Sequence, residues 1–187
     1  MTYKIPEYTD WLKKQNKHQP TLDYAREIRS AIIDLEGNKY LEIGNAWGVS
    51  TIVILDTLDG FLTSVDKDSN SRVYDQVKAS PYASRFEWRL MDSHKFWEQD
   101  NDQYDLVYID GSHKYEQAKE DMQEGWKRLK KGGYLLADDY CHPANNKADD
   151  RTKTHAKYGV SLSVCELIRE NAPKIIYAGE HVIGFRK

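Results

Sequence analysis

Apolar positions along the chain alternate between two spacings, and Gly, Asn, Asp or Pro stands at each change. Ala25, Ile28, Ile32 and Leu35 recur at helical spacing, and this pattern stops at Gly37. Further helices are expected at 49–60, 69–80, around 96–97, 115–131 and 160–171. Short apolar runs that predict strands occupy 39–44, 61–66, 85–93, 104–110, 134–138, 174–179 and 181–186.

The segment after the strand expected at 104–110 carries one apolar stripe on an otherwise charged helix. The stripe residues, three or four positions apart, are Tyr115, Ala118, Met122, Trp126 and Leu129. Acidic residues stand early in this segment and basic residues late, which matches the helix dipole. We expect Gly132-Gly133 to end the helix with a left-handed cap, before the strand at 134–138.

Alternating strands and helices predict an α/β fold with a doubly wound, mostly parallel sheet in a three-layer sandwich. Gly179-Glu180 separates the last two strands, which predicts a C-terminal antiparallel hairpin at the sheet edge. A chain of 187 residues has room for one hydrophobic core, so we expect a single domain over 1–187. Residues 1–37 are its expected N-terminal helical segment. The long polar stretch 140–158 lacks periodicity and is expected to be a lid or substrate loop.

Composition and charge narrow the classes of function. The formal net charge is −3, and acidic and basic residues are mixed, so no basic patch predicts a nucleic-acid or anionic membrane partner. Cys141 and Cys165 are too few for a disulfide framework, and the N-terminus lacks the apolar core of a signal peptide. No apolar run is long enough to span a bilayer. We therefore expect a cytoplasmic protein with no nucleic acid and no membrane among its partners.

In an open parallel sheet, ligands bind where strands end and helices begin. After the first strand, Gly44 and Gly48 allow a tight turn that approaches a ligand, and the next helix directs its N-terminal amides there. The spacing is not that of the dinucleotide fingerprint, and Glu42 stands where a pyrophosphate would be repelled. Asp66 ends the second strand about twenty residues after Gly44, where a carboxylate accepts hydrogen bonds from ribose hydroxyls.

The third strand ends at Asp92 and Ser93, a position suited to the adenine edge of a nucleotide-type ligand. Both residue types also favour helix N-caps. The alternative that they cap the following short helix therefore stays open.

Four blocks of sequence, in order, resemble one enzyme family. They are "EIGNAWGVS", the acid Asp66, "YIDGSHKYE" and "GGYLLADDY", and they cover roughly residues 38–140. Together they resemble class I S-adenosylmethionine-dependent methyltransferases, and among these the small-molecule O-methyltransferases of the macrolide-sugar and cephalosporin-tailoring type. The resemblance implies a Rossmann-like fold with S-adenosylmethionine as cofactor, its methionine end at Glu42 and the Gly44 turn, its ribose at Asp66 and its adenine at Asp92. The expected cofactor-binding set is Glu42, Gly44, Asn45, Gly48, Ser50, Asp66, Asp92, Ser93 and Asp110.

The resemblance also implies a divalent metal, usually Mg²⁺, held by the acid that ends the fourth strand and the acidic pair that ends the fifth. In this chain these residues are Asp110, Asp138 and Asp139. Mg²⁺ prefers oxygen ligands in octahedral geometry and keeps several waters, so carboxylates on neighbouring strand ends leave room for substrate hydroxyls. The alternative for Asp138-Asp139 is a solvated turn before the long loop.

His113 lies three residues after Asp110, in the first turn of the next expected helix, so both side chains are expected at one sheet edge. A hydroxyl is a poor nucleophile until it loses its proton, which an imidazole can accept near neutral pH. The histidine at this position in the family resembles such a base. We therefore expect His113 and Asp110 to be catalytic, and the alternative is a helix-start histidine bonded to a backbone carbonyl.

The predicted function is metal-assisted methylation of a hydroxyl on a small molecule, such as a sugar, a phenol or a natural product. The chain lacks an insertion large enough to cap the substrate, so we expect an accessible substrate or a pocket completed in a homo-oligomer. One alternative is a non-catalytic protein of the same fold that binds S-adenosylmethionine or a nucleotide. Another is a nicotinamide-dependent oxidoreductase, against which the missing third glycine and Glu42 argue.

Overall fold

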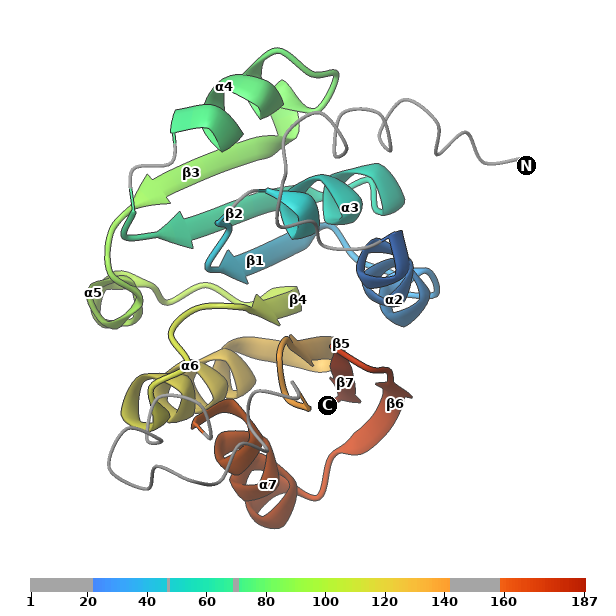
Figure 1. Ribbon diagram of the computed structural model, residues 1–187, viewed down its shortest axis with the longest axis vertical. Coiled ribbons are helices and arrows are strands. Elements are labelled where there is room, and N and C mark those ends of the chain that lie inside the picture. The colour runs from blue at the N-terminus through green and yellow to red at the C-terminus, as the bar shows by residue number, and fades with distance from the viewer. Residues whose placement is uncertain (1–21, 47, 69–70, 142–158) are drawn as a thin grey trace.

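The computed structural model describes residues 22–46, 48–68, 71–141 and 159–187 (Figure 1). Residues 1–21 of the expected N-terminal segment and residues 142–158 of the expected lid loop lie outside the described residues. Within the described ranges, no helix is both long and apolar enough to cross a membrane.

Strands and helices alternate along the chain as the apolar spacing predicts. The strands are β1 (Lys39–Ile43), β2 (Phe61–Asp66), β3 (Phe86–Leu90), β4 (Tyr104–Ile109), β5 (Leu129–Ala137), β6 (Lys174–Ala178) and β7 (Ile183–Arg186). The helices are α2 (Leu22–Ile32), α3 (Val49–Thr57), α4 (Ser71–Lys78), α5 (Ser93–Gln99), α6 (Tyr115–Arg128), α7 (Gly159–Asn171) and the short 3₁₀ turn η1 (Ala83–Arg85).

The strands form one sheet in the order β3-β2-β1-β4-β5-β7-β6. The first five strands along the chain pair in parallel, whereas β7 runs antiparallel to both β5 and β6. This order confirms the doubly wound sheet and the C-terminal hairpin. The strand sequence reverses between β1 and β4, and ligands of open α/β sheets bind at the carboxyl ends of strands at such a switch point.

Helices cover both faces of the sheet (Figure 1). Tyr40 of β1 packs in one core cluster with Ile28 of α2 and Ile54 of α3. Its neighbour Leu41 points to the opposite face and packs in a second cluster with Met122 of α6. Because successive strand residues face opposite sides, the sheet is buried on both, as parallel sheets usually are.

The boundary between α6 and β5 differs from the prediction. The helix ends at Arg128, and β5 begins at Leu129, so the glycine pair lies inside a strand rather than at a helix cap. Gly132 does have a left-handed φ of 86°. A Cβ on Gly133 would lie 2.8 Å from the carbonyl oxygen of Asp105. The pair therefore serves an irregular stretch of strand pairing beside β4, not the end of the helix.

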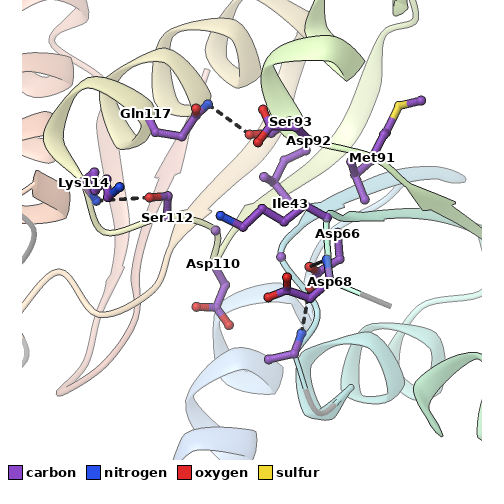
Figure 2. Close-up of a pocket in the computed structure, with 15 residues that line it drawn as sticks. Ile43, Asp66, Asp68, Met91, Asp92, Ser93, Asp110, Ser112, Lys114 and Gln117 are labelled. Atoms are coloured by element: carbon purple, nitrogen blue, oxygen red, sulfur yellow. Dashed lines mark hydrogen bonds between the residues drawn. The ribbon is translucent and has the colours of Figure 1, made fainter. Parts of the chain in front are cut away.

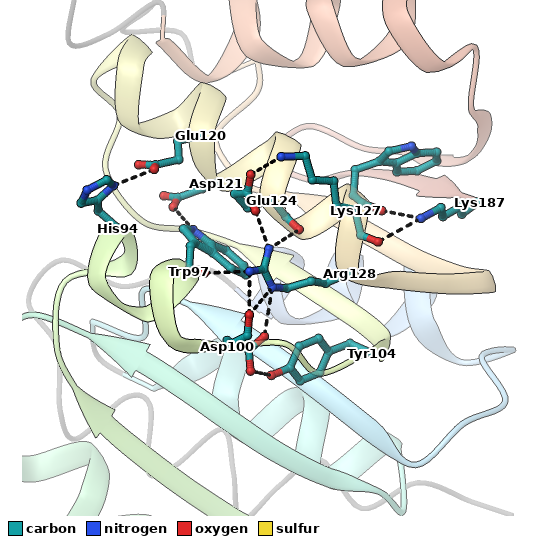
Figure 3. Close-up of polar contacts among 11 residues, drawn as sticks. His94, Trp97, Asp100, Tyr104, Glu120, Asp121, Glu124, Lys127, Arg128 and Lys187 are labelled. Carbon is teal, nitrogen blue, oxygen red and sulfur yellow. Dashed lines mark hydrogen bonds and ion pairs between the residues drawn. The ribbon is translucent and has the colours of Figure 1, made fainter.

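A cluster of buried polar contacts ties the end of α5 to α6 (Figure 3). Arg128 donates through Nη2 to the carbonyl oxygens of Trp97 and Asp100, each at 2.7 Å. Its Nε lies 3.2 Å from the Asp100 carboxylate, which also accepts a 2.8 Å hydrogen bond from the Tyr104 hydroxyl. The Arg128 and Asp100 side chains are 13% and 4% exposed, and Arg128, which also pairs with Glu124, compensates the buried Asp100 charge. The cluster fixes α5, whose first residue, Ser93, lines the pocket described below.

Candidate functional site

A pocket of about 560 Å³ opens at the carboxyl ends of β1, β2, β3 and β4 (Figure 2). It is lined by Ile43, Gly44, Ala46, Val65, Asp66, Lys67, Asp68, Met91, Asp92, Ser93, Asp110, Gly111, Ser112, Lys114 and Gln117. Five of the residues expected to bind the cofactor are in this lining, namely Gly44, Asp66, Asp92, Ser93 and Asp110. The pocket thus lies at the switch point between β1 and β4 that the sheet topology predicts.

The turn after β1 depends on a glycine at position 44. Gly44 has a φ of 83°, and a Cβ there would lie 2.0 Å from the carbonyl oxygen of Asp110. Its amide continues the parallel ladder by donating to the Val65 carbonyl at 2.8 Å. Only a residue without a side chain fits where the ends of β1 and β4 come this close.

Asp66 joins the end of β2 to this glycine turn. One of its carboxylate oxygens, Oδ2, accepts hydrogen bonds from the backbone amides of Asn45 at 2.9 Å and Ala46 at 3.1 Å. The other, Oδ1, accepts from the Asp68 amide at 2.9 Å, and Figure 2 shows Asp66 and Asp68 side by side in the pocket wall. The carboxylate therefore both shapes the turn and stands beside the space where a ligand would lie.

Asp92 and Ser93 form the far wall of the pocket. The Asp92 carboxylate accepts a 3.0 Å hydrogen bond from the His94 amide and caps α5, which confirms the capping alternative for this residue. Both residues still line the pocket, so capping does not remove them from it. The Ser93 hydroxyl accepts a 3.0 Å hydrogen bond from Nε2 of Gln117 on α6.

Glu42 does not lie in the pocket. Its carboxylate is fully buried and accepts hydrogen bonds from the hydroxyls of Ser50 (2.6 Å), Thr51 (2.7 Å) and Ser64 (2.5 Å). Burial raises the pKa of Glu42 to about 7, although the three hydroxyls oppose this effect. Glu42 therefore joins β1, β2 and α3 behind the glycine turn, and its contact with a cofactor stays a prediction.

Three other expected cofactor residues lie outside the pocket lining for the same reason. Asn45 and Ser50 are 2% exposed, and Nδ2 of the Asn45 side chain donates to the Ser64 hydroxyl at 3.0 Å. Gly48, with a φ of 76°, is the N-cap of α3. These residues build the turn from behind, and only the Asn45 backbone reaches toward the pocket, through its bond to Asp66.

The ends of β4 and β5 bring Asp110 and Asp138 together with two buried tyrosines. The Tyr24 hydroxyl donates to Oδ2 of Asp138 at 2.9 Å and lies 2.7 Å from the Tyr108 hydroxyl. Burial, and then the charges of Asp138 and Asp139, raise the pKa of Asp110 well above its usual range. Burial and the charge of Asp139 raise the pKa of Asp138 to about 7. These acids are thus held close together at an energetic cost.

Asp139 points elsewhere. Its backbone has a left-handed φ of 55°, and its Oδ2 lies 3.3 Å from Nε2 of His113. Asp110, Asp138 and Asp139 therefore do not converge on one point; within the described ranges, a group with all ligand atoms inside 4.8 Å is formed by Glu27, Glu180 and His181. The side chain of Asp139 lies beside the expected base, His113, and is 25% exposed.

His113 stands before α6 rather than in its first turn. The helix begins at Tyr115, and Lys114 precedes it with an extended backbone, so His113 belongs to the loop after β4. Its side chain is about half exposed. Among the described residues, its ring lies against the Asp139 carboxylate.

Sequence reasoning missed three residues at the site. Tyr24 lies four residues before Ile28 on the apolar face of α2, and a buried tyrosine there signals a hydroxyl that needs a partner. Gln117 follows the loop after β4, a place where ligand contacts are common, but its residue type gives no signal. Asp121 is fully buried beside the apolar stripe of α6 and accepts from Nε1 of Trp97 at 2.7 Å.

Fold and pocket together define a Rossmann-like protein with a pocket at the carboxyl ends of its parallel strands. A family model described as "Methyltransferase domain" matches residues 41–140. The match covers more than half of the chain, and the chain therefore belongs to this methyltransferase family. No curated protein matches the sequence.

Several solved structures share the fold. An O-methyltransferase from Bacillus cereus, solved with S-adenosylhomocysteine (SAH), superposes with a TM-score of 0.76 at 13% identity, covering 97% of this chain and 88% of that one. The SAH-bound methyltransferase PaMTH1 of Podospora anserina gives 0.78 at 10% identity, covering 100% and 88%. The O-methyltransferase TomG of Streptomyces achromogenes, solved with S-adenosylmethionine (SAM), gives 0.71 at 14% identity, covering 87% and 79%. At these identities the similarity shows the fold alone.

Proposed function

We propose that the protein is a SAM-dependent methyltransferase that methylates a hydroxyl group on a small molecule with the help of a divalent cation. The observation that carries the proposal is the pocket at the ends of β1, β2 and β4, where Gly44, Asp66 and Asp110 meet in a chain of the methyltransferase family. O-methyltransferases among the structures of the same fold support the choice of acceptor atom.

In this proposal the cofactor lies along the carboxyl ends of the strands. The turn at Gly44 lets the backbone approach its methionine part, and Asp66 accepts hydrogen bonds from its ribose hydroxyls. Asp92 and Ser93 bound the adenine end, because they stand on the opposite wall of the pocket. Asp110 lies beside Gly44, toward the place where the methyl group would be transferred.

The residues present fit a divalent cation at Asp110 and Asp138. Oδ1 of Asp138 is a buried oxygen without a hydrogen-bond partner in the described part of the chain. A cation there would offset the burial and mutual repulsion that raise the pKa values of both acids. When bound, Mg²⁺ supplies positive charge that lowers the pKa of a coordinated hydroxyl.

His113 is the proposed acceptor of the proton that the substrate hydroxyl loses. Asp139, 3.3 Å away, holds the ring and stabilises the charge that it gains, as carboxylate partners of catalytic histidines do. The ring is half exposed, so it can pass the proton on to water.

Isothermal titration calorimetry with SAH tests the first part of the proposal. We expect binding by the wild type and a loss of about 1–3 kcal/mol for Asp66→Ala, since ribose hydroxyls lose their charged acceptor. Asp68→Ala is the matched control, because Asp68 lines the same pocket but its backbone amide, not its carboxylate, contacts Asp66. If the intact protein binds NADH but shows no measurable binding at millimolar SAH, the result supports the oxidoreductase alternative.

Methyl transfer from SAM to a panel of catechols, phenols and sugars tests the remaining part. We expect a chelator to abolish transfer and Mg²⁺ to restore it. Asp138→Asn should bind SAH normally yet lose the response to Mg²⁺, because Asp138 lies outside the pocket lining. Undiminished transfer in excess chelator contradicts the role of the metal, and SAH binding without transfer to any acceptor supports the non-catalytic alternative.

A further inference from the structure

Tyr24 reaches the acidic site from α2, an element that is remote from it in sequence. The residue is 9% exposed, and its hydroxyl lies 2.9 Å from Oδ2 of Asp138 and 3.5 Å from Oδ2 of Asp110. The same hydroxyl lies 2.7 Å from that of Tyr108, a fully buried residue of β4. Helix α2 is thus connected by hydrogen bonds to the residues that follow β4 and β5, Asp110 and Asp138.

Counting protons gives this network a direction. Each tyrosine hydroxyl has a single proton to donate. An ionised Asp138 carboxylate, the form that binds a cation, only accepts, so the Tyr24 proton then lies on the 2.9 Å contact with Oδ2 of Asp138, and Tyr108 donates to Tyr24 across 2.7 Å. The order of donation is Tyr108 to Tyr24 to Asp138, and each donor in it is used once.

The two oxygens of Asp138 consequently differ. Oδ2 accepts the Tyr24 hydroxyl, whereas Oδ1 is buried and has no hydrogen-bond partner within the described residues. We propose that Tyr24, itself oriented by Tyr108, is a positioning residue that fixes the Asp138 carboxylate so that Oδ1 is presented to a divalent cation. This inference rests on the metal-assisted function proposed above.

Tyr24 is held in place from a second side. The ring of His181 packs edge-on against the Tyr24 ring, with centroids 5.9 Å apart. Glu27 of α2 holds the turn that carries His181. Its carboxylate accepts hydrogen bonds from the backbone amides of Glu180, His181 and Val182 at 3.0–3.1 Å. The ring therefore has little freedom to move, and the hydroxyl keeps its direction toward Asp138.

Binding of Mn²⁺ and of SAH, measured separately by calorimetry, tests this role. Mn²⁺ serves as the probe because it takes the same oxygen ligands as Mg²⁺. Tyr24→Phe keeps the ring against His181 and removes only the hydroxyl. We expect Mn²⁺ affinity to fall tenfold or more, the usual effect of losing a partner that orients a metal ligand, while SAH affinity stays within twofold.

Tyr104→Phe is the matched control. Tyr104 is also buried, and its hydroxyl also donates to a buried carboxylate, that of Asp100, at 2.8 Å. This pair lies in the cluster around Arg128, away from the pocket lining. The control variant should lower the melting temperature but leave both affinities unchanged.

Several results overturn the inference. One is a folded Tyr24→Phe variant with wild-type Mn²⁺ affinity, and another is a parallel loss of Mn²⁺ and SAH affinity, which indicates a merely structural role. A wild type that binds SAH but not Mn²⁺ refutes the inference and leaves methyl transfer itself standing, whereas a wild type that binds neither refutes the proposed function. If Tyr24→Phe does not fold, Tyr108→Phe replaces it, with a threefold or larger loss of Mn²⁺ affinity expected and no loss counting against the role of Tyr24.

Discussion

Glu42→Gln removes the titration of a fully buried acid while keeping its size. The carboxylate of Glu42 accepts three hydroxyl hydrogen bonds and has no cationic partner in the described part of the chain, and burial raises its pKa from an ordinary 4.5 to about 7. Each pKa unit corresponds to about 1.36 kcal/mol, so ionised Glu42 destabilises the folded state by roughly 3 kcal/mol. The side chain is completely shielded from water, and no discount for solvent screening applies.

The sign follows from comparing the two states. Below pH 4.5 the carboxyl is protonated in both folded and unfolded chains and contributes nothing. Between pH 4.5 and 7 the folded state holds the proton more tightly, so stability falls as the pH rises through this window, and above pH 7 the loss is complete. The amide introduced by Glu42→Gln does not ionise, and the variant should escape this loss.

Urea unfolding at pH 5 and pH 8 measures the effect. We expect the free energy of unfolding of Glu42→Gln, relative to wild type, to improve by roughly 2–3 kcal/mol between these two pH values. Losing an acceptor for the surrounding hydroxyls costs the variant about the same at both pH values, so that cost cancels in the comparison. Glu87→Gln, at a side chain 44% exposed on the edge strand β3, is the control and should show no such change.

A pH-independent difference between Glu42→Gln and wild type would refute this reasoning, because it would mean that the folded state does not raise the affinity of Glu42 for its proton. The same variant tests the placement of Glu42 behind the glycine turn. SAH affinity should stay within a few-fold of wild type. A hundredfold loss of SAH affinity would instead indicate that Glu42 contacts the cofactor.

Three further predictions concern the glycine turn, the proposed base and the polar cluster. Gly44→Ala should destabilise the fold by more than the ~1–2 kcal/mol of a left-handed backbone, because the new Cβ meets the Asp110 carbonyl, and thermal unfolding checks this. His113→Ala should reduce the methyl-transfer rate by on the order of 10²–10⁴ with unchanged SAH affinity, and a variant with the wild-type rate would exclude His113 as the base. Arg128→Met should lower the free energy of unfolding by about 3–5 kcal/mol, because it leaves the Asp100 charge buried and alone, and intact SAH affinity should show that the damage is confined to stability.

The strand ends of the pocket could be predicted because they depend on spacing alone. Alternating apolar runs give the order of the elements, and parallel pairing places Asp66 and Asp110 at one edge of the sheet. The start of β5 could not be predicted in this way. Leu129 continues the helical spacing of α6, but in the structure it pairs with Tyr104 of β4 and is the first residue of β5.

The sequence did not predict which way the side chains at the site point. The carboxylate of Glu42 turns inward because three hydroxyls, two of them from the helix after the turn, surround it. These hydroxyls belong to residues without a common spacing in the sequence, so no sequence pattern predicts that they gather around Glu42. Tyr24 was missed for a similar reason, since its partner Asp138 lies 114 residues further along the chain.

The adjacent acids Asp138 and Asp139 show how a single backbone angle divides the chemistry. The Asp138 amide still donates to the Ile109 carbonyl at 2.9 Å, so this residue continues the β5–β4 ladder and its side chain meets Tyr24. Asp139 then takes a φ of 55°, a left-handed conformation that Asp tolerates better than most residues, and its carboxylate turns to His113. The two acids therefore have different partners: Asp138 accepts the Tyr24 hydroxyl, and Asp139 lies against the His113 ring. The left-handed conformation at position 139 favours a short polar residue such as Asp, and it directs the second carboxylate away from the partner of the first.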